Sequence, residues 1–434
     1  MPAQTLAQKL LAAAAGRDAV RVGEIVTCKV DLAMFHDSSG PRRLQPMLEE
    51  LGTGLWDRSR IVLVMDHYVP ESDDESRRIV RIARDWAREQ ALPHVYDSLG
   101  ICHVVVPEHG HVRPGMFCVG GDSHSPTGGA FGAYMFGVGS TEMLGVVSSG
   151  EIWMRVPDTL MMHWRGRLRP GVMAKDMMLH MIGLHGMNGG RYQAVEFCGE
   201  AVRALSMQER MTLSNMSAEL GAQAGLIAPD RTTAQYLRQA DAPDRTTAQY
   251  LRQADAPEPD TARWQSDPDA PAQWHEYDAD SLPPYVAAPH SPANAAPVQA
   301  YADTAVQVAY IGACTGAKLD DLRAAAQVLR GRRVAPGVSL LVAPASQRDQ
   351  ARAQDEGVLP ALVEAGATVL PTTCGACSGY GGSIPDGANV ISTTARNFKG
   401  RMGAASARVY LASPYTVAAS ALAGRIADPR EVLS

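Results

Sequence analysis

The stretch Val308-Ala309-Tyr310-Ile311-Gly312-Ala313-Cys314-Thr315-Gly316 decides the fold of the C-terminal part of the chain. Its first four residues form a short apolar run that is typical of a buried strand. Leucine and alanine then recur at helical spacing over residues 322–329, so Cys314 is predicted between a strand end and a helix N-terminus. Ligands collect at such places in open α/β sheets, and the helix dipole favours a thiolate there.

A pair of cysteines follows another short apolar run, residues 367–370, in the sequence Cys374-Gly-Ala-Cys377. A Cys-x-x-Cys motif alone is compatible with a redox dithiol, half of a zinc site or two packed thiols. Together with Cys314, three thiolates from two parallel strand ends can converge on one metal centre. Spacing alone leaves buried, unreactive cysteines equally open. Three cysteines on a four-iron cluster leave one iron without a thiolate, and such an iron is a Lewis acid.

Composition limits the class of protein. The chain has 434 residues, enough for two or three domains, and a formal net charge of -6, which argues against nucleic acid as the main partner. Its seven cysteines are an odd number, so a disulfide framework is not expected. Neither a signal peptide nor an apolar run of the ~18 residues that cross a bilayer is found. These features predict a soluble cytoplasmic protein without a membrane partner.

The N-terminal half alternates strand-like and helix-like segments. Residues 60–65 predict a buried strand ending in Asp66-His67, and residues 79–86 predict a surface helix. Residues 101–106 predict a further strand. Residues 120–139 form a glycine-rich loop that lacks the Lys-Ser/Thr of a phosphate-binding loop.

The middle of the chain contains a helix signal and then a repeat. The capping box Ser206-x-x-Glu209 predicts a helix of roughly 18 residues. Composition then shifts to alanine, proline and aspartate, and residues 228–241 recur unchanged as residues 242–255. Two copies are too few for a solenoid, so we interpret them as a duplication tolerated in a surface connection. Alternating patterns resume near residue 300 and end in a predicted helix over 415–425.

Five motifs in this order resemble the aconitase superfamily. They are Gly121-Asp-Ser-His-Ser-Pro-Thr-Gly-Gly-Ala-Phe-Gly-Ala133, the segment 203–221, Gly312-Ala-Cys-Thr-Gly316, Cys374-x-x-Cys377 and Arg396-Asn-Phe-Lys-Gly-Arg401. The likeness is closest to the large subunit of the 3-isopropylmalate dehydratase branch. It spans the chain except for the Ala/Pro/Asp-rich segment, and it is specific to the superfamily rather than to a substrate.

The resemblance implies an α/β fold of three domains with parallel and mixed sheets flanked by helices. Domains 1 and 2 would occupy residues 1–298, including the connection 226–298, and domain 3 would occupy residues 299–434 with the cysteines. The further, swivelling domain of single-chain aconitases would come from a separate small subunit. The implied activity is a hydro-lyase that reversibly dehydrates a small hydroxy di- or tricarboxylic acid.

The resemblance also implies a [4Fe–4S] cluster and a set of site residues. The cluster ligands would be Cys314, Cys374 and Cys377. The residues implied in catalysis are Asp66, His67, His103, Asp122, His124 and Glu219, and those implied in substrate binding are His36, Ser123, Asn215, Arg396 and Arg401. Imidazoles oriented by carboxylates can protonate a departing hydroxide, and guanidinium groups bind carboxylates.

Two positions depart from the family's pattern, because Gly316 and Ala395 stand where asparagine is usual. Amides there would hydrogen-bond near the cluster or its substrate, so their loss bears on substrate recognition. Other substrates of the same class stay open, namely homoaconitate, 2,3-dimethylmalate and citraconate- or maleate-type acids. Outside the class, a non-catalytic iron-sensing or RNA-binding relative and a three-cysteine zinc hydrolase also stay open.

Overall fold

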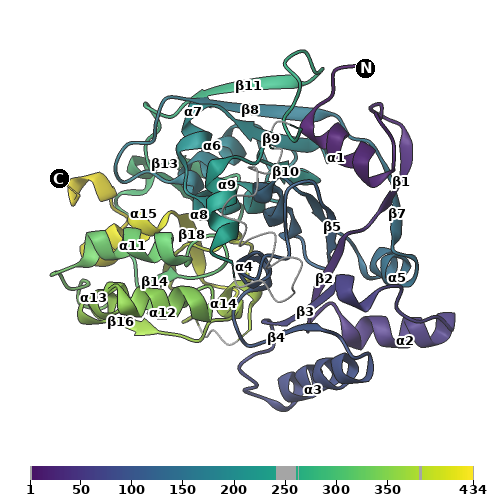
Figure 1. The fold of residues 1–434 in the computed structure, drawn as a ribbon. Coiled ribbons are helices and arrows are strands. Elements are labelled where there is room, and N and C mark those ends of the chain that lie inside the picture. The colour runs from purple at the N-terminus through teal and green to yellow at the C-terminus, as the bar shows by residue number, and fades with distance from the viewer. Residues whose placement is uncertain (1, 241–260, 262, 381–383, 434) are drawn as a thin grey trace. The chain divides into compact units, whose positions relative to one another are not determined.

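The computed structural model describes residues 2–240, 261, 263–380 and 384–433 (Figure 1). The chain forms two compact units, each assembled from three separate segments. Unit 1 contains residues 1–97, 105–164 and 190–277, and unit 2 contains residues 98–104, 165–189 and 278–434. The predicted domain boundary at residue 298 stays a prediction. No helix in the described part of the chain is both long and apolar enough to span a membrane.

Unit 1 is built on a five-stranded parallel sheet of order β4-β3-β2-β5-β6. Its strands are β2 (Leu32–His36), β3 (Ile61–Met65), β4 (His94–Asp97), β5 (Phe117–Gly120) and β6 (Tyr134–Gly137). The predicted strand over 60–65 is confirmed as β3, whose five residues are all buried. A parallel strand covered on both faces requires such an unbroken apolar run.

Helices and short turns pack around this sheet. They are α1 (Leu6–Ala14), α2 (Pro41–Leu51), η1 (Arg58–Arg60), α3 (Asp74–Glu89), η2 (Ser125–Phe131) and α5 (Ser140–Ser149). The predicted surface helix is confirmed as α3, which begins at an Asp73 capping box and buries Ile79, Ala83 and Trp86 on one face. Figure 1 shows α3 alongside β3 and β4.

Two smaller sheets complete unit 1. A ribbon joins β1 (Ile25–Lys29) to β7 (Glu151–Arg155), and a second sheet has the order β10-β9-β8-β11. The strands of the second sheet are β8 (Thr159–Arg165), β9 (Ala194–Cys198), β10 (Ala224–Leu226) and β11 (Gln273–Asp278). The associated helices are α7 (Glu200–Ala204), α8 (Met207–Met216) and α9 (Arg231–Arg238).

A clasp closes residues 265–267 onto the start of the chain. Ser266 Oγ accepts a hydrogen bond from the Leu6 amide at 2.7 Å, and Asp267 accepts one from the Gln4 amide at 2.8 Å. Lys9 Nζ also donates to the Gln265 carbonyl at 2.6 Å. The Ser266 bond satisfies the Leu6 amide, which lies in the first turn of α1 and has no partner within the helix.

Unit 2 is built on a seven-stranded mixed sheet of order β13-β12-β18-β17-β14-β15-β16. The five parallel strands are β14 (Val308–Ile311), β15 (Ser339–Val342), β16 (Ala367–Val369), β17 (Asn389–Ser392) and β18 (Arg408–Ala412). The antiparallel edge consists of β12 (Tyr285–Ala287) and β13 (Ala295–Pro297). The strand and following helix predicted around Cys314 are confirmed as β14 and α11.

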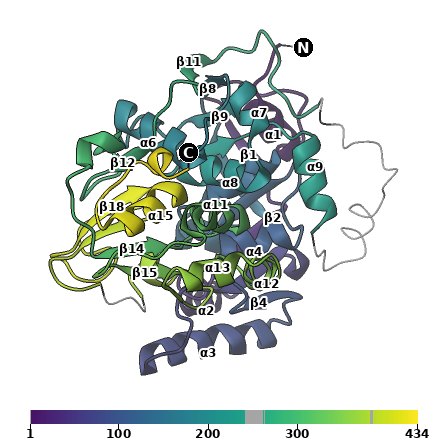
Figure 2. The same ribbon diagram turned by 90° about the vertical axis from the view of Figure 1, so that its left-hand side faces the viewer.

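Helices flank this second sheet. They are α6 (Ala174–His185), η3 (Val298–Tyr301), α11 (Leu319–Leu329), α12 (Gln347–Asp355), α13 (Val358–Glu364), α14 (Gly375–Ser378), α15 (Pro414–Ala423) and η4 (Pro429–Glu431). Helices α11 and α15 pack side by side, and α15 also lies against β14 (Figure 2). The predicted C-terminal helix is confirmed as α15.

Two local predictions are wrong. Residues 101–106, predicted as a strand, lie in helix α4 (Cys102–Glu108), because so short an apolar run does not distinguish the two structures. Helix α8 has ten residues rather than about 18, because the chain leaves the helix in tight turns up to Gly221, whose φ is 82°. The connection 226–298 contains helix α9 and strands β11 to β13. The second repeat copy lies, from residue 242 on, outside the described residues.

Candidate active site

The three predicted cluster cysteines come from one edge of the unit 2 sheet. Strand β15 pairs in parallel with both β14 and β16, so the carboxyl ends of β14 and β16 lie at the same edge. Cys314 follows β14 after Ala313, whose φ of 69° turns the chain out of the strand direction. Cys374 and Cys377 flank the short helix α14 that follows β16.

Negative charge on these cysteines acts on neighbouring groups of unit 2. Burial raises the pKa of the Tyr310 phenol on β14, and negative charge on Cys377 and Cys374 raises it further. Lys175 feels the charge of both Cys377 and Cys314. All seven cysteines are free of disulfides, and Cys314 and Cys377 are buried. Three thiols, without a fourth cysteine, fit a cluster that keeps one iron open to substrate.

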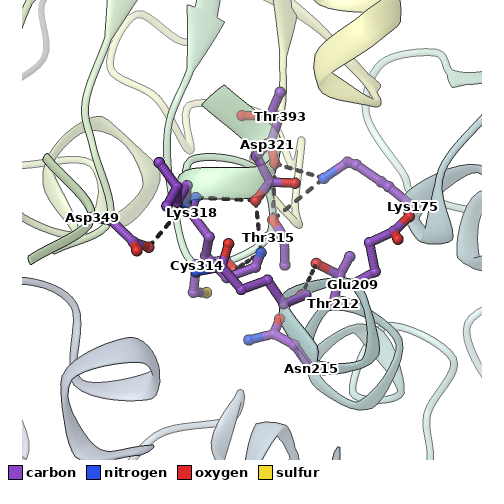
Figure 3. Close-up of polar contacts among 12 residues, drawn as sticks. Lys175, Glu209, Thr212, Asn215, Cys314, Thr315, Lys318, Asp321, Asp349 and Thr393 are labelled. Carbon is purple, nitrogen blue, oxygen red and sulfur yellow. Dashed lines mark hydrogen bonds and ion pairs between the residues drawn. The ribbon is translucent and has the colours of Figure 1, made fainter. Parts of the chain in front are cut away.

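Two buried lysines hold the turn that carries Cys314 (Figure 3). Lys318 Nζ donates to the Cys314 carbonyl at 2.8 Å and forms an ion pair with Asp321 at 2.8 Å. Lys175 Nζ, from α6, donates to the carbonyls of Thr393 and Thr394 at 2.6 and 2.9 Å. The sequence motifs do not single out either lysine, because an isolated lysine carries no pattern.

Gly316, one of the two departures from the family pattern, has a steric cause. A Cβ at Gly316 would lie 2.2 Å from the Thr393 Cβ, so the Thr393 side chain occupies the space that a side chain at 316 needs. Thr393 Oγ1 in turn donates to the Gly312 carbonyl and accepts from the Gly312 amide, both at 2.8 Å. An asparagine at 316 would have to displace this hydroxyl. Ala395 is buried, and nothing in the structure explains the alanine there.

The two predicted arginines lie on the loop that follows β17. Asn397, fully buried between them, fixes the loop by donating from Nδ2 to the carbonyls of Ala288 and Val409 at 2.8 and 3.0 Å. The buried Arg401 Nε has no hydrogen-bond acceptor among the described residues. The Arg401 carbonyl would lie 3.1 Å from a Cβ at Gly379, two residues after Cys377. A guanidinium so placed fits an anionic ligand.

In unit 1, Asp66 and His67 form a close pair at the end of β3. Asp66 Oδ1 lies 2.6 Å from His67 Nδ1, and Asp66 is fully buried. Burial disfavours the imidazolium, but the charge and hydrogen bond of Asp66, with the charges of Asp122 and Asp37, outweigh burial. Together they raise the pKa of His67 to about 9. His67 therefore carries a proton at neutral pH, with Nδ1 bound to Asp66 and Nε2 directed elsewhere.

Asp37 is a residue of this site that the sequence interpretation missed. Its carboxylate accepts hydrogen bonds from the backbone amides of His67 and Tyr68 at 3.1 and 2.8 Å, which fixes the loop after β3. Burial, and after it the charge of Asp66, raises the pKa of Asp37. The only available signal was its position after His36, at the end of the neighbouring strand β2.

Asp122 connects the predicted residues of unit 1. His36 stacks on His67 with ring centroids 3.8 Å apart, and its Nε2 lies 3.7 Å from Asp122 Oδ2. Asp122 Oδ1 accepts a hydrogen bond from the His124 amide at 2.8 Å. His36, Asp37, Asp66 and His67 also offer ligand atoms close enough for one cation, but their mutual hydrogen bonds already use several of these atoms.

Helix α8 and the turn after it provide the remaining carboxylate and amide. Glu219, fully buried, places Oε1 2.9 Å from His124 Nε2. Asn215 donates from Nδ2 to Thr127 Oγ1 at 2.8 Å. Unit 1 thus brings together His36, Asp66, His67, Asp122, His124 and Glu219.

Ser123 and His103 are the two other polar residues predicted for the site. Ser123 is exposed on the loop between Asp122 and His124. His103 is buried in α4, on the short segment 98–104 that belongs to unit 2.

A hollow in unit 1, about 1080 Å³ in volume, contains none of the predicted site residues. Strand β7 and residues 137–142 form much of its wall, with Trp153 and Tyr192 among its exposed aromatic side chains. Nothing in its lining provides the acid–base pairs found around Asp122.

Comparison with known proteins identifies similar chains over the full length. A family model described as "Aconitase family (aconitate hydratase)" matches residues 8–304 and 299–424. The "3-isopropylmalate dehydratase large subunit 1" of Methanopyrus kandleri is 42% identical, over 99% of this chain and 100% of the relative. The protein of that name from Pyrococcus furiosus is 40% identical, over 100% of both chains.

A solved structure supports the fold. The holo-form crystal structure of Thermococcus kodakaraensis aconitase X matches with a TM-score of 0.50 at 12% identity. The match covers 86% of this chain and 84% of that one. The predicted α/β architecture, with parallel and mixed sheets between helices, is confirmed.

Proposed function

The chain belongs to the aconitase family of iron–sulfur hydro-lyases, and on this basis we propose that it is the large subunit of a 3-isopropylmalate-type dehydratase. The reaction would be the reversible removal of water from a small hydroxy di- or tricarboxylic acid. Full-length relatives named as large subunits support this assignment, and also a separate small subunit as partner.

The observation that carries the proposal is the position of Cys314, Cys374 and Cys377 after β14 and β16, two strands whose carboxyl ends lie at the same edge of the sheet. These three side chains would hold a [4Fe–4S] cluster. When bound, the cluster supplies a Lewis-acidic iron that polarises the substrate hydroxyl. Free thiols fit this role in a reducing compartment, and we propose the cytoplasm.

The protein's own residues would handle the substrate and the proton. Arg401, with Arg396 on the same loop, would bind a substrate carboxylate and keep the acid in one orientation. His67, protonated and oriented by Asp66, would deliver a proton from Nε2 to the departing hydroxyl oxygen. The Asp37 carboxylate would keep His67 in place by accepting a hydrogen bond from the His67 backbone amide.

The other residues of unit 1 would support the same proton transfer. His124, held by Glu219 through Nε2, and Asp122 would set the charge around His36 and His67. His36, Ser123 and Asn215 would contribute to substrate binding, and His103 to the acid–base group. The base that removes the carbon-bound proton is assigned to the small subunit.

The deciding experiment measures iron, acid-labile sulfide and zinc in anaerobically purified protein, with Cys314→Ala as the comparison. We expect about four irons and four sulfides per chain, strongly reduced in the variant. A Cys198→Ala variant serves as the control, because Cys198 lies on β9 of unit 1, and it should keep the full content.

Zinc in place of iron, or full iron content in Cys314→Ala, would contradict the proposal. Turnover of candidate hydroxy acids is then measured with and without the small subunit. We expect little activity from the large subunit alone. Equal activity with and without the small subunit would contradict the proposed need for that subunit.

A further inference from the structure

Lys175 is a cation buried without a carboxylate of its own. It is 1% exposed, and among the described residues no carboxylate lies within ion-pair distance of its Nζ. Asp321, the carboxylate whose charge it feels most, is already paired with Lys318 at 2.8 Å. Burying a charge that has only neutral partners lowers the stability of the folded protein. We therefore expect Lys175 to have a function that offsets this loss.

The hydrogen bonds of Lys175 join two segments that carry site residues (Figure 3). Nζ donates to the Thr393 and Thr394 carbonyls, three and two residues before Arg396, and to Thr315 Oγ1 at 3.3 Å, next to Cys314. Thr315 Oγ1 closes the triangle by donating to the Thr393 carbonyl at 2.8 Å. Thr315, Thr393 and Thr394 are all fully buried.

These bonds lie where the main-chain ladder stops. Strands β14 and β17 pair from Val308 to Tyr310, and the last backbone bond runs from the Thr393 amide to the Tyr310 carbonyl at 3.0 Å. Beyond that point the Thr393 hydroxyl and Lys175 provide the connections. Removing Lys175 would therefore take the donor away from the Thr394 carbonyl and leave the Thr393 carbonyl with the Thr315 hydroxyl as its side-chain donor.

Cys314, next to the Thr315 hydroxyl that Lys175 binds, would carry compensating negative charge when it holds a metal cluster. Burial lowers the pKa of Lys175 to about 8, while the charges of Cys377 and Cys314 act in the opposite direction. Three thiolates around a metal cluster bring negative charge to this place, which a nearby ammonium stabilises.

We propose that Lys175 is a positioning residue that joins the Cys314 turn to the loop carrying Arg396 and supplies the counter-charge of the cysteine-bound cluster. The charge part rests on the function proposed above, and the joining part does not. Neither part requires Lys175 to touch the substrate.

The test compares Lys175→Met with Lys29→Met, an exposed lysine on β1. Both changes remove one ammonium group and leave an unbranched side chain of similar length. Hydrogen exchange of the backbone amides in peptides 312–318 and 392–401 is measured by mass spectrometry on anaerobically purified protein. We expect at least tenfold faster exchange in both peptides for Lys175→Met and no change for Lys29→Met.

The charge is tested by the reduction midpoint potential of the bound cluster. Lys175→Met should lower this potential, because reduction adds a negative charge that the ammonium no longer stabilises. Thr315→Val removes the hydrogen bonds of the Thr315 hydroxyl but no charge. It should therefore speed up hydrogen exchange of the backbone amides and leave the reduction potential of the cluster unchanged. With the small subunit present, KM should rise more than kcat falls, because the Arg396 loop is misplaced rather than the acid removed.

Unchanged exchange together with an unchanged potential in Lys175→Met would overturn the proposal. If Lys175→Met does not fold, Thr315→Val still decides the joining role by exchange. If the wild-type chain binds no cluster, the proposed function fails and with it the counter-charge. Hydrogen exchange of Lys175→Met and Lys29→Met, measured on the cluster-free chain, then tests only whether Lys175 joins the two segments.

Discussion

Among single residues, Asp66 has the largest predicted effect on the proton chemistry. Asp66→Asn removes the charge that sustains the raised pKa of His67, so that pKa should fall from about 9 toward or below 6.5. Histidine titration by NMR measures the fall directly. Turnover with the small subunit should drop by ~10²–10⁴-fold, the usual contribution of a general acid.

The same pair makes stability depend on pH with a defined sign. The folded state holds the His67 proton more tightly than the unfolded chain does, so the stabilisation is fully present below pH 6.5. It is lost as the pH rises through 9. The melting-temperature difference between wild type and Asp66→Asn should shrink over that range. A difference that stays constant would contradict the assigned pKa. Asp74→Asn, at a fully exposed carboxylate, is the control.

A residue could be predicted when it belongs to a recognisable sequence motif. Cys314 and the Cys374–Cys377 pair follow strand-like runs, so spacing alone located them at the sheet edge. Asp37, Lys175 and Lys318 were not predicted, because their roles depend on burial and on partners far away in the sequence. Lys175, for example, bonds Thr393, 218 residues further on.

At the scale of elements, helix α9 anchors the first repeat copy. Asp230 of the first copy caps α9 and accepts two 2.7 Å bonds from the guanidinium of the fully buried Arg210. Asp230→Ala should therefore lower the free energy of unfolding by about 2–4 kcal/mol, since it leaves a buried cation without its carboxylate.

The sequence itself provides a matched control for that prediction. Asp244 is the corresponding residue of the second copy, in the identical local sequence. Because Arg210 is already paired with Asp230, Asp244→Ala should change the free energy of unfolding, measured by urea denaturation, by less than about 0.5 kcal/mol. Equal losses in the two variants would show that both copies are anchored.

Elements with strong periodicity or caps were predictable, and short apolar runs were not. Helix α3 has a capping box and one apolar face, and strand β3 is an unbroken apolar run, so both were predicted correctly. Residues 101–106 have the composition of a strand, but the Ile101 amide bonds to the Ala345 carbonyl and helix α4 begins directly after it. That tertiary bond has no local sequence signal.

At the scale of the whole molecule, buried carboxyl groups should make the protein less stable as the pH rises. Burial raises the pKa of Glu196, on β9, to about 7, although hydrogen bonds from Ser266 and the Leu6 amide oppose the rise. The unfolded chain releases the Glu196 proton near pH 4.5, whereas the folded protein keeps this proton up to about pH 7. The contribution is thus fully present below pH 4.5 and is lost as the pH rises to 7.

Glu196→Gln isolates this contribution, because glutamine has the same shape and does not ionise. Relative to wild type, the variant should gain about 3 kcal/mol of stability between pH 4.5 and pH 8. Thermal unfolding at the two pH values measures the gain. A constant difference between variant and wild type would show that Glu196 loses its proton at the same pH in the folded and the unfolded protein.

The architecture was predictable only in part. Parallel α/β sheets follow from alternating strand and helix patterns and from the family resemblance. The assembly of each compact unit from three separate segments does not, because nothing local marks residues 98–104 or 165–189 as belonging with the C-terminal part of the chain.

The clasp between α1 and residues 265–267 has a consequence for synthesis on the ribosome. Leu6 and its partner Ser266 are 260 residues apart. At translation rates of ~5–20 residues per second, about 13–50 s separate their appearance. During that interval the Gln4 and Leu6 amides lack their native partners, Asp267 and Ser266. The first helix made is thus among the last to be secured, and a nascent-chain chaperone has its longest opportunity to act there.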